Sequence, residues 1–546
     1  MATFVTTPVS LETAQHATHK PGLTHDRIFA AWLTGALTAF AIAVHGYHPY
    51  AEDGGLYMAG VKRLLDPSLY PHETAFVVEH LHFSLFAPMA AELARVVGQL
   101  SGVAPMRSLP LVLLGLHGMS IWLTLFAAWL LAARCFATRT ARTGSVVLLA
   151  CWLGLPVAGT SLILMDPYLT ARSFSTPCMI LLLVGILDLT DGSDSDLALW
   201  RRRGLALSVG AVAGAALMHP LMAAYALNAC MTLACLRATR QTVRVWGTGA
   251  LCASAIALVA GLQAIAPTET TDYIKIAMTR PYWFLSTWHW YEVVGLLAPM
   301  AIPMWVQRRL AGADSSGARR ALAQMGAVVG TLGCVVALAF AHADAATHLV
   351  ARLQPLRAFQ VVYVVMTLFL GALLAERVLQ RSALRWATAL LLLGAVMFAA
   401  ERVTYPGSEH FEGPRAMARA EASNPWVQAF VWIRENTPKD ALFALDPDYI
   451  SHPGEDAQGF RALAERSALP DYSKDGGEAS IAPELTEAWT LGQSAQAGLS
   501  AATTTDAERV TALRPLGVGW VVLERGALTG LDCPFANAAV RVCRLP

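Results

Sequence analysis

Eleven apolar segments, separated by short polar loops, constrain what this chain can fold into. A helix needs about 17–25 predominantly apolar residues to cross a bilayer, and most of the segments reach that length. They run over 27–47, 110–133, 144–164, 175–190, 204–218, 219–236, 246–266, 291–306, 322–341, 359–375 and 386–400. Only 14% of the 546 residues are charged, against about 25% in soluble domains. We therefore predict a polytopic α-helical membrane protein with about 11 transmembrane helices and exclude a soluble enzyme.

Arginines in alternate loops give the orientation of these helices. One set of loops holds sixteen of them: Arg134, Arg139, Arg142, Arg201, Arg202, Arg203, Arg237, Arg240, Arg244, Arg308, Arg309, Arg319, Arg320, Arg377, Arg381 and Arg385. Cytoplasmic loops carry the excess of Lys and Arg, so we place these loops in the cytoplasm. We expect a cytoplasmic N-terminal tail (1–26) without a cleavable signal sequence, a transmembrane module (27–402) and an extracytoplasmic domain (403–546). A bacterial inner (plasma) membrane protein with a periplasmic domain fits this order.

The C-terminal domain differs from the rest of the chain in charge and pattern. It holds 19 acidic and 12 basic side chains, and the whole chain has a net charge of only +1, so nucleic acid is not an expected partner. The ranges 425–436 and 455–466 read as helices, and 441–445, 517–523 and 538–543 as strands, which predicts an α/β domain. Cys533 and Cys543 would pair in an oxidising compartment, with two reduced thiols as the alternative.

The first outer loop, 47–109, is long and carries the most informative stretch of the sequence. Two ranges in it, 53–65 and 74–97, have the mixed pattern of helices lying on a membrane surface. Directly after the first span the chain reads His48-Pro-Tyr-Ala-Glu-Asp-Gly-Gly-Leu-Tyr57. A carboxylate pair followed by glycines that admit a ligand suits a base at the membrane boundary. The alternative is that Glu52 and Asp53 only cap the next helix.

This acidic pair, the long first loop, the many spans and the outer domain together resemble the GT-C class of integral-membrane glycosyltransferases. That class includes oligosaccharyltransferases, protein mannosyltransferases and aminoarabinose transferases. The resemblance implies that a carboxylate of the first loop, here Asp53 or else Glu52, is the catalytic base or helps to hold a divalent metal such as Mg or Mn. The tail lacks the WWDYG sequence of the oligosaccharyltransferases, so transfer to Asn of a protein is not expected.

Cations on the outer side oppose the insertion bias and therefore need a reason. Arg172 precedes one span, and Arg352 and Arg357 precede another. Arg binds phosphate in a bidentate manner, and charge at a membrane boundary indicates function, so we expect contacts with a lipid phosphate. Lys275 and Arg280 are weaker candidates of the same kind. The alternatives are snorkelling or a salt bridge, for example to Asp166 or Asp344.

Histidines and aromatic residues of the outer side complete the candidate site. His80 and His82 diverge by about 200° on a helix and could share a metal only on a strand. We expect them, with Tyr57, to contact substrate, or else to be ordinary interfacial residues. His219, before Pro220, would line a cavity or mark a kink. His289 lies among aromatic residues that form either an interfacial belt or a stacking surface.

These features lead to one expected function and two alternatives. We expect a GT-C-type, inverting glycosyltransferase of the cell envelope that moves a sugar from a polyprenyl-phosphate-linked donor to a glycan, lipid or protein acceptor at the outer face. Membrane lipid is the other expected partner. A transporter or flippase for a lipid-linked or small polar solute would place charges within the spans and interrupt matching helices. A non-catalytic assembly protein would lack a cavity joining Asp53 to the outer arginines.

Overall fold

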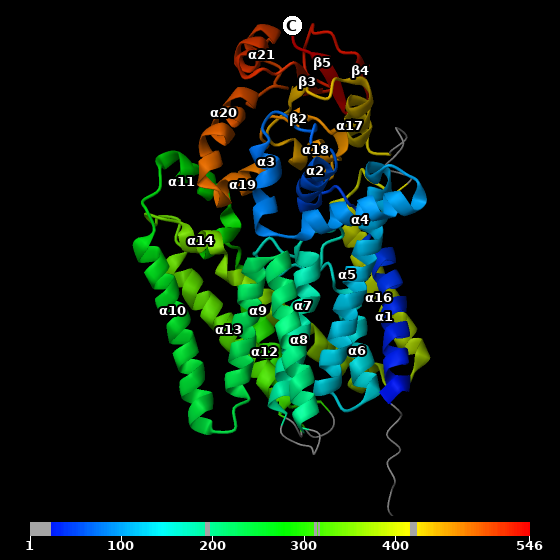
Figure 1. The fold of residues 1–546 in the computed structure, drawn as a ribbon, viewed down its shortest axis with the longest axis vertical. Coiled ribbons are helices and arrows are strands. Elements are labelled where there is room, and N and C mark those ends of the chain that lie inside the picture. Colours follow the sequence, from blue (N-terminus) through cyan, green and yellow to red (C-terminus); the bar gives the residue numbers. More distant parts are fainter. Residues whose placement is uncertain (1–22, 192–196, 311–313, 315–316, 415–422) are drawn as a thin grey trace, which may run out of the picture.

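The computed structural model describes residues 23–191, 197–310, 314, 317–414 and 423–546. Long helices stand side by side, and a C-terminal unit with a small sheet covers one end of them (Figure 1). Of the expected N-terminal tail, residues 1–22 lie outside the described residues, and 23–26 already belong to the first helix, α1 (Leu23–His45).

Seven segments of the described chain are long and apolar enough to cross a membrane. They are Ile28–His45 in α1, α5 (Pro105–Cys135), α7 (Arg172–Thr190), Val243–Ile265 with α10 (Thr248–Ile265), α13 (Ala318–Phe340), Leu349–Leu379 with α14 (Leu349–Leu353), η5 (Pro355–Ala358) and α15 (Phe359–Leu374), and α16 (Ala383–Thr404). Two shorter apolar helices, α9 (Pro220–Leu236) and α12 (Trp290–Val306), lie among them, and α8 (Leu197–Met218) packs along α7. The protein is thus a membrane protein with a C-terminal extramembrane domain.

One predicted span is wrong in its extent. The helix expected over 144–164 is α6 (Arg139–Cys151), and the chain after it turns back through a bridge between Pro156 and Ile163. Val157 N donates to Leu162 O at 2.8 Å within this turn. Pro156 cannot supply the amide that a helix requires, so the apolar residues beyond it fold as a loop. Several of them line the cavity described below.

Small residues let the membrane helices approach closely. A Cβ on Gly144 of α6 would lie 2.4 Å from Gly371 O of α15, and one on Gly185 of α7 would lie 2.3 Å from Ser208 Oγ of α8. Such contacts are typical of helix packing in membranes, where van der Waals contact replaces the hydrophobic drive. The turn from α9 to α10, which holds Arg237, Arg240 and Arg244, lies at the end opposite the C-terminal unit (Figure 1).

The first outer loop folds into several short helices. They are α2 (Asp53–Leu65), α3 (Ala75–Val78), η1 (Glu79–Phe83) and α4 (Phe86–Ser101). The single helix expected over 74–97 is broken at Ser84, because Ser84 Oγ donates to Met218 O at 2.6 Å and Leu85 N donates to Leu217 O at 2.8 Å. These bonds tie the loop to the end of α8.

The C-terminal unit is the predicted α/β domain. Its helices are α17 (Pro425–Asn436), η8 (Tyr449–Ser451), α18 (Phe460–Ala464), α19 (Lys474–Ile481), η9 (Pro483–Leu485), α20 (Thr486–Gln496), α21 (Asp506–Leu513) and η10 (Arg514–Leu516). Its strands are β1 (Leu442–Ala444), β2 (Ser467–Ala468), β3 (Trp520–Glu524), β4 (Phe535–Ala536) and β5 (Val540–Arg544), in the order β2-β1-β3-β5-β4. Strand β1 runs parallel to β2 and β3, and β5 is antiparallel to its neighbours. The helix expected over 455–466 shortens to α18.

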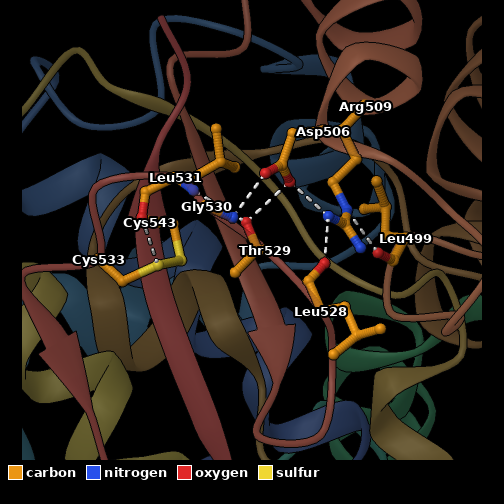
Figure 2. The surroundings of a disulfide bond; sticks show 9 residues. All are labelled: Leu499, Asp506, Arg509, Leu528, Thr529, Gly530, Leu531, Cys533 and Cys543. Atoms are coloured by element: carbon orange, nitrogen blue, oxygen red, sulfur yellow. Dashed lines mark hydrogen bonds and ion pairs between the residues drawn. A yellow bond between two sulfur atoms is a disulfide. The ribbon is translucent and has the colours of Figure 1, made fainter.

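A disulfide joins Cys533 to Cys543 of β5. Figure 2 shows the polar contacts beside it: the Asp506 carboxylate accepts hydrogen bonds from Thr529 Oγ1 and Gly530 N, both at 2.7 Å. The buried Arg509 donates from Nε to Leu499 O and from Nη1 to Leu528 O, each at 2.9 Å. The loop before Cys533 is therefore fixed by hydrogen bonds between its residues 528–530 and the charged side chains of Asp506 and Arg509.

The first loop and the C-terminal unit dock through backbone contacts at the start of α2. Tyr50 O accepts from Gly459 N at 2.9 Å, and Glu52 N donates to Ala457 O at 2.8 Å. A Cβ on Gly55 would lie 2.8 Å from Gly459 Cα. We expected the glycines after Asp53 to admit a ligand. Gly55 instead allows the backbone of the C-terminal unit, the outer domain, to approach closely, because no side chain fits between the two backbone segments there.

Candidate functional site

A cavity of about 1010 Å³ lies where the first loop, the membrane helices and the outer domain meet. Its walls come from the start of α2, the turn after α6, the starts of α7 and α9, the segment before α15, the end of α16 and the start of α19. The residues predicted from sequence that line it are Glu52, Asp53, Tyr57, His80, Arg172, His219, Arg280, Arg352 and Arg357. One cavity thus joins the acidic pair to the outer arginines.

Asp53 is held between two cations from distant parts of the chain. Its Oδ2 lies 3.1 Å from Arg172 Nη2, and its Oδ1 lies 3.2 Å from Lys474 Nζ. Burial raises the pKa of Asp53, but Lys474 and Arg172 outweigh this and hold the pKa below its usual range. The carboxylate is therefore ionised at neutral pH, and its side chain is 31% exposed toward the cavity.

Glu52 occupies the N-cap position of α2 but does not cap it through its side chain. Its backbone has φ 52° and ψ −135°, a conformation that costs a residue with a Cβ about 1–3 kcal/mol and tends to occur at functional sites. Its carboxylate pairs instead with Lys474 Nζ. Glu52 therefore makes no side-chain cap, whereas Asp53 lies in the first turn of α2, where an acidic residue is favourable; both carboxylates also face cations in the cavity.

Arg172 is the first residue of α7 and bridges two carboxylates. Besides Asp53, its Nη2 contacts Asp166 Oδ2 at 3.1 Å, the salt bridge considered from sequence. Asp166 is buried, and burial raises the pKa of its carboxyl although Arg172 opposes this. The same Nη2 thus contacts both carboxylates, and Asp166 and Asp53 together hold Arg172 in place.

Arg357 differs from Arg172 because it has no acidic partner among the described residues. It lies in η5, lines the cavity, and its buried Nε has no hydrogen-bond partner. An unpaired guanidinium in a cavity attracts an anion, and phosphate matches its planar set of donors. Arg357 is therefore the best placed cation for an anionic ligand.

The other predicted cations are used by the protein itself. Arg352 Nη2 lies 3.5 Å from Glu269 Oε1, and Lys275 pairs with Asp272 on the surface, outside the cavity. Arg280 donates to Ser473 O at 2.7 Å and to Tyr472 O at 2.6 Å, which fixes the turn that carries Lys474. We expected Lys275 to contact a lipid phosphate beside the other cations. It lies exposed on α11 (Thr271–Met278), outside the cavity that holds them.

The histidines divide into two that line the cavity beside the acids and two that do not. His80 is buried against Tyr57, with both ring nitrogens lacking a partner and its pKa lowered by burial to about 4. His219 lies at the N-cap of α9. His82 faces outward, since residues two apart on the 3₁₀ helix η1 diverge. His289 is exposed and stacks on Tyr291 at 5.2 Å, as in an interfacial belt.

Two cavity residues escaped the sequence analysis. Lys474 and Glu478 lie on α19, more than 400 positions after Asp53, and only the fold brings them together. Glu478 is buried, and burial next to Asp475 and Asp53 raises its pKa to about 8, so its carboxyl is mainly protonated at neutral pH.

The acidic pair does not fit a divalent metal ion. Lys474 Nζ contacts both Glu52 and Asp53, so it lies where an ion shared by the two carboxylates would bind. Within the described residues a separate group could hold a metal: Asp446, His452 and Glu524, whose ligand atoms lie within 4.8 Å of one another. Asp446 and His452 lie in the segment after β1, and Glu524 is the last residue of β3. None of the three lines the cavity.

Among known proteins, only the comparison with solved structures gives matches to this chain. No protein-family model and no curated protein matches the chain. The chain is similar to the archaeal oligosaccharyltransferase AglB from Archaeoglobus fulgidus in complex with an inhibitory peptide and a dolichol-phosphate, with 12% identity, a TM-score of 0.47, and 91% of this chain and 70% of that chain covered. It is also similar to the Archaeoglobus fulgidus oligosaccharyltransferase tethered to an acceptor peptide, with 14% identity, a TM-score of 0.48, and 92% and 69% covered.

Proposed function

We propose that this protein is a membrane glycosyltransferase that uses a polyprenyl-phosphate-linked sugar and acts at the outer face of a bacterial inner membrane. The observation that carries this proposal is one cavity at the membrane boundary that holds an ionised carboxylate, Asp53, and an unpaired guanidinium, Arg357. Transfer of a sugar from a lipid phosphate needs one group that accepts a proton and one that stabilises a departing phosphate.

Asp53 is the base in this proposal. The acceptor hydroxyl oxygen attacks the anomeric carbon of the sugar from the face opposite the phosphate, which inverts the configuration. As this bond forms, the oxygen becomes acidic and its proton passes to an Asp53 carboxylate oxygen. The lowered pKa of Asp53 keeps it ionised until then, and proton transfer occurs late, when the oxygen is far more acidic than a free hydroxyl.

Arg357 stabilises the leaving group. The bond between the anomeric carbon and the phosphate oxygen breaks, and the electron pair stays on that oxygen. Arg357 donates to the developing charge, and Arg172, which is held by Asp166 and Asp53, adds a fixed positive charge nearby. Removal of one such donor typically costs about 10²–10³ in rate.

The cavity walls suit the two ends of such a donor. Leu155, Ile163, Leu221 and Met397 line it from the membrane helices and their turns, where a prenyl chain would lie. Polar residues of the outer domain line the other side, where the acceptor, a glycan, lipid or protein, would enter. The proposal keeps the C-terminal domain outside the cytoplasm; the disulfide supports this, because disulfides persist in oxidising compartments.

Turnover of prenyl-phosphate-linked sugars in detergent tests this proposal. We expect Asp53→Asn to lose about 10²–10⁴-fold in rate and Arg357→Ala about 10²–10³-fold. Asp66→Asn and Arg95→Ala are matched controls, because Asp66 pairs with Lys439 and Arg95 with Glu92 outside the cavity. Both controls should keep the wild-type rate.

The proposal fails if folded Asp53→Asn and Arg357→Ala turn over every tested donor at the wild-type rate. Movement of intact prenyl-linked sugar across liposomes without release of the sugar would overturn it in favour of a flippase. A panel of donors that differ only in the sugar identifies the sugar that this cavity accepts.

A further inference from the structure

Lys474 occupies the position that a metal ion would take between the two acidic residues of the first loop. Its Nζ lies 3.2 Å from Asp53 Oδ1 and also contacts Glu52 Oε2. A divalent ion binds carboxylate oxygens at about 2.0–2.6 Å, so an ion shared by Glu52 and Asp53 would coincide with the ammonium group. The two cations exclude each other.

The ammonium group is held in place by the fold around it. Lys474 begins α19, its side chain is 18% exposed, and its backbone N donates to Asp471 Oδ1 at 2.5 Å. Arg280 binds the carbonyls of the two residues before it. A Cβ on Gly476 would lie 2.6 Å from Arg280 Nη2, so the Arg280 guanidinium packs directly against the backbone of α19. Lys474 therefore does not behave as a mobile surface lysine.

The charges around Asp53 are already balanced by the protein. Three carboxylates, Glu52, Asp53 and Asp166, share the cavity with three cations, Lys474, Arg172 and Arg357, so the sum of these charges is zero. A divalent ion added to this set would leave excess positive charge in a partly enclosed cavity, where charges are poorly screened. Glu478 does not offset this, since its carboxyl is mainly protonated at neutral pH.

We propose that Lys474 of the outer domain replaces a divalent metal as the counter-ion of Glu52 and Asp53, so that sugar transfer proceeds without a metal at this site. Lys474 is a positioning residue: it orients the two carboxylates and touches neither the sugar nor the phosphate. The catalytic half of this inference rests on the proposed function. The binding half, that the acidic pair holds a metal only when Lys474 is removed, does not.

Mn²⁺ titration followed by electron paramagnetic resonance tests the binding half without any substrate. All proteins carry His452→Ala, which removes the separate Asp446-His452-Glu524 group as a source of bound Mn²⁺. In this background we expect the chelator-treated parent to bind no Mn²⁺, Lys474→Met to gain one site, and Lys474→Met combined with Asp53→Asn to lose it. Lys62→Met is the matched control, because Lys62 also joins α2 to the outer domain but pairs with a single carboxylate, Glu465. It should gain no site.

Two binding results would overturn the inference: a Mn²⁺ site in the parent that Asp53→Asn abolishes, or no site in folded Lys474→Met. The parent measurement decides even if Lys474→Met does not fold. In the activity assay we expect chelator to leave the wild-type rate unchanged, Lys474→Met to lose about tenfold or more, and Lys474→Arg to retain most of the rate. Activity lost to chelator and restored by Mn²⁺ in the wild type would also overturn it. If no donor is turned over at all, the proposed function fails while the Mn²⁺ result still stands.

Discussion

Gly55→Ala tests whether the docking of the outer domain onto α2 builds the cavity. The added Cβ would lie 2.6 Å from Tyr50 O, 2.8 Å from Gly459 Cα and 3.2 Å from Gly459 N. All three neighbours are backbone atoms, so no side chain can rotate away and the outer domain must shift.

The magnitude follows from two opposing terms. Alanine in place of glycine stabilises a helix by about 0.5–1 kcal/mol. Overpacking of a tight contact costs about 1–3 kcal/mol. Since two of the three contacts, at 2.6 and 2.8 Å, are shorter than real Cβ atoms essentially ever show and involve backbone atoms, we expect a net loss of about 1–2 kcal/mol. The shift also moves Lys474 away from Asp53, so turnover should fall as well.

The assay is thermal unfolding in detergent, followed by intrinsic tryptophan fluorescence, beside the turnover assay. Gly115→Ala in α5 is the matched control, because nothing lies within 4 Å of a Cβ there, and it should be neutral or stabilising. Gly459→Ala approaches the same contact from the other side, with its Cβ 2.8 Å from Gly55 Cα, and should resemble Gly55→Ala. A Gly55→Ala midpoint equal to that of Gly115→Ala would refute the argument.

Two further predictions concern pH and the disulfide. The pKa of Glu478 is raised from 4.5 to about 8 in the folded state, so the folded state binds this proton more tightly than the unfolded state. The resulting contribution to the free energy of unfolding is present at pH 4 and is lost as the pH rises toward 8. Thermal midpoints measured from pH 5 to 8 should therefore fall more for the wild type than for Glu478→Gln; parallel curves would contradict this. Replacing Cys533 and Cys543 with Ser opens a loop with a sequence separation of 10, which should cost about 2–3 kcal/mol of stability by unfolding of the outer domain while turnover at low temperature is unchanged. An unchanged midpoint, or loss of turnover in a folded variant, would contradict that prediction.

Local patterns predicted the elements well where local forces decide them. The surface helix expected over 53–65 is α2 with the same bounds, and 425–436 is α17, started by Asn424, which accepts from Trp426 N and Val427 N, and by Pro425. Apolar length located most membrane helices for the same reason: each must satisfy its own backbone within the bilayer. It failed over 144–164, where apolar residues follow Pro156 into a loop that the rest of the protein buries.

The candidate site was predictable only in part. Arg172 and Arg357 stood out because charge near a bilayer is costly without a use, and Asp53 stood out as part of an acidic pair followed by glycines; all three line one cavity. Lys474 and Glu478 gave no such signal, since charged residues are ordinary in an outer domain. Their importance arises from docking contacts such as Gly55 with Gly459, which no local pattern encodes.

The pairing of Asp53 with Lys474 has a consequence for biosynthesis. Since 421 positions separate the two partners, the ribosome synthesises the acidic half of the pocket long before its counter-ion. A ribosome that stops before residue 474 leaves helices that can insert and pack, yet no working centre. Under the proposed function, turnover therefore begins only once α19 has folded back onto the first loop.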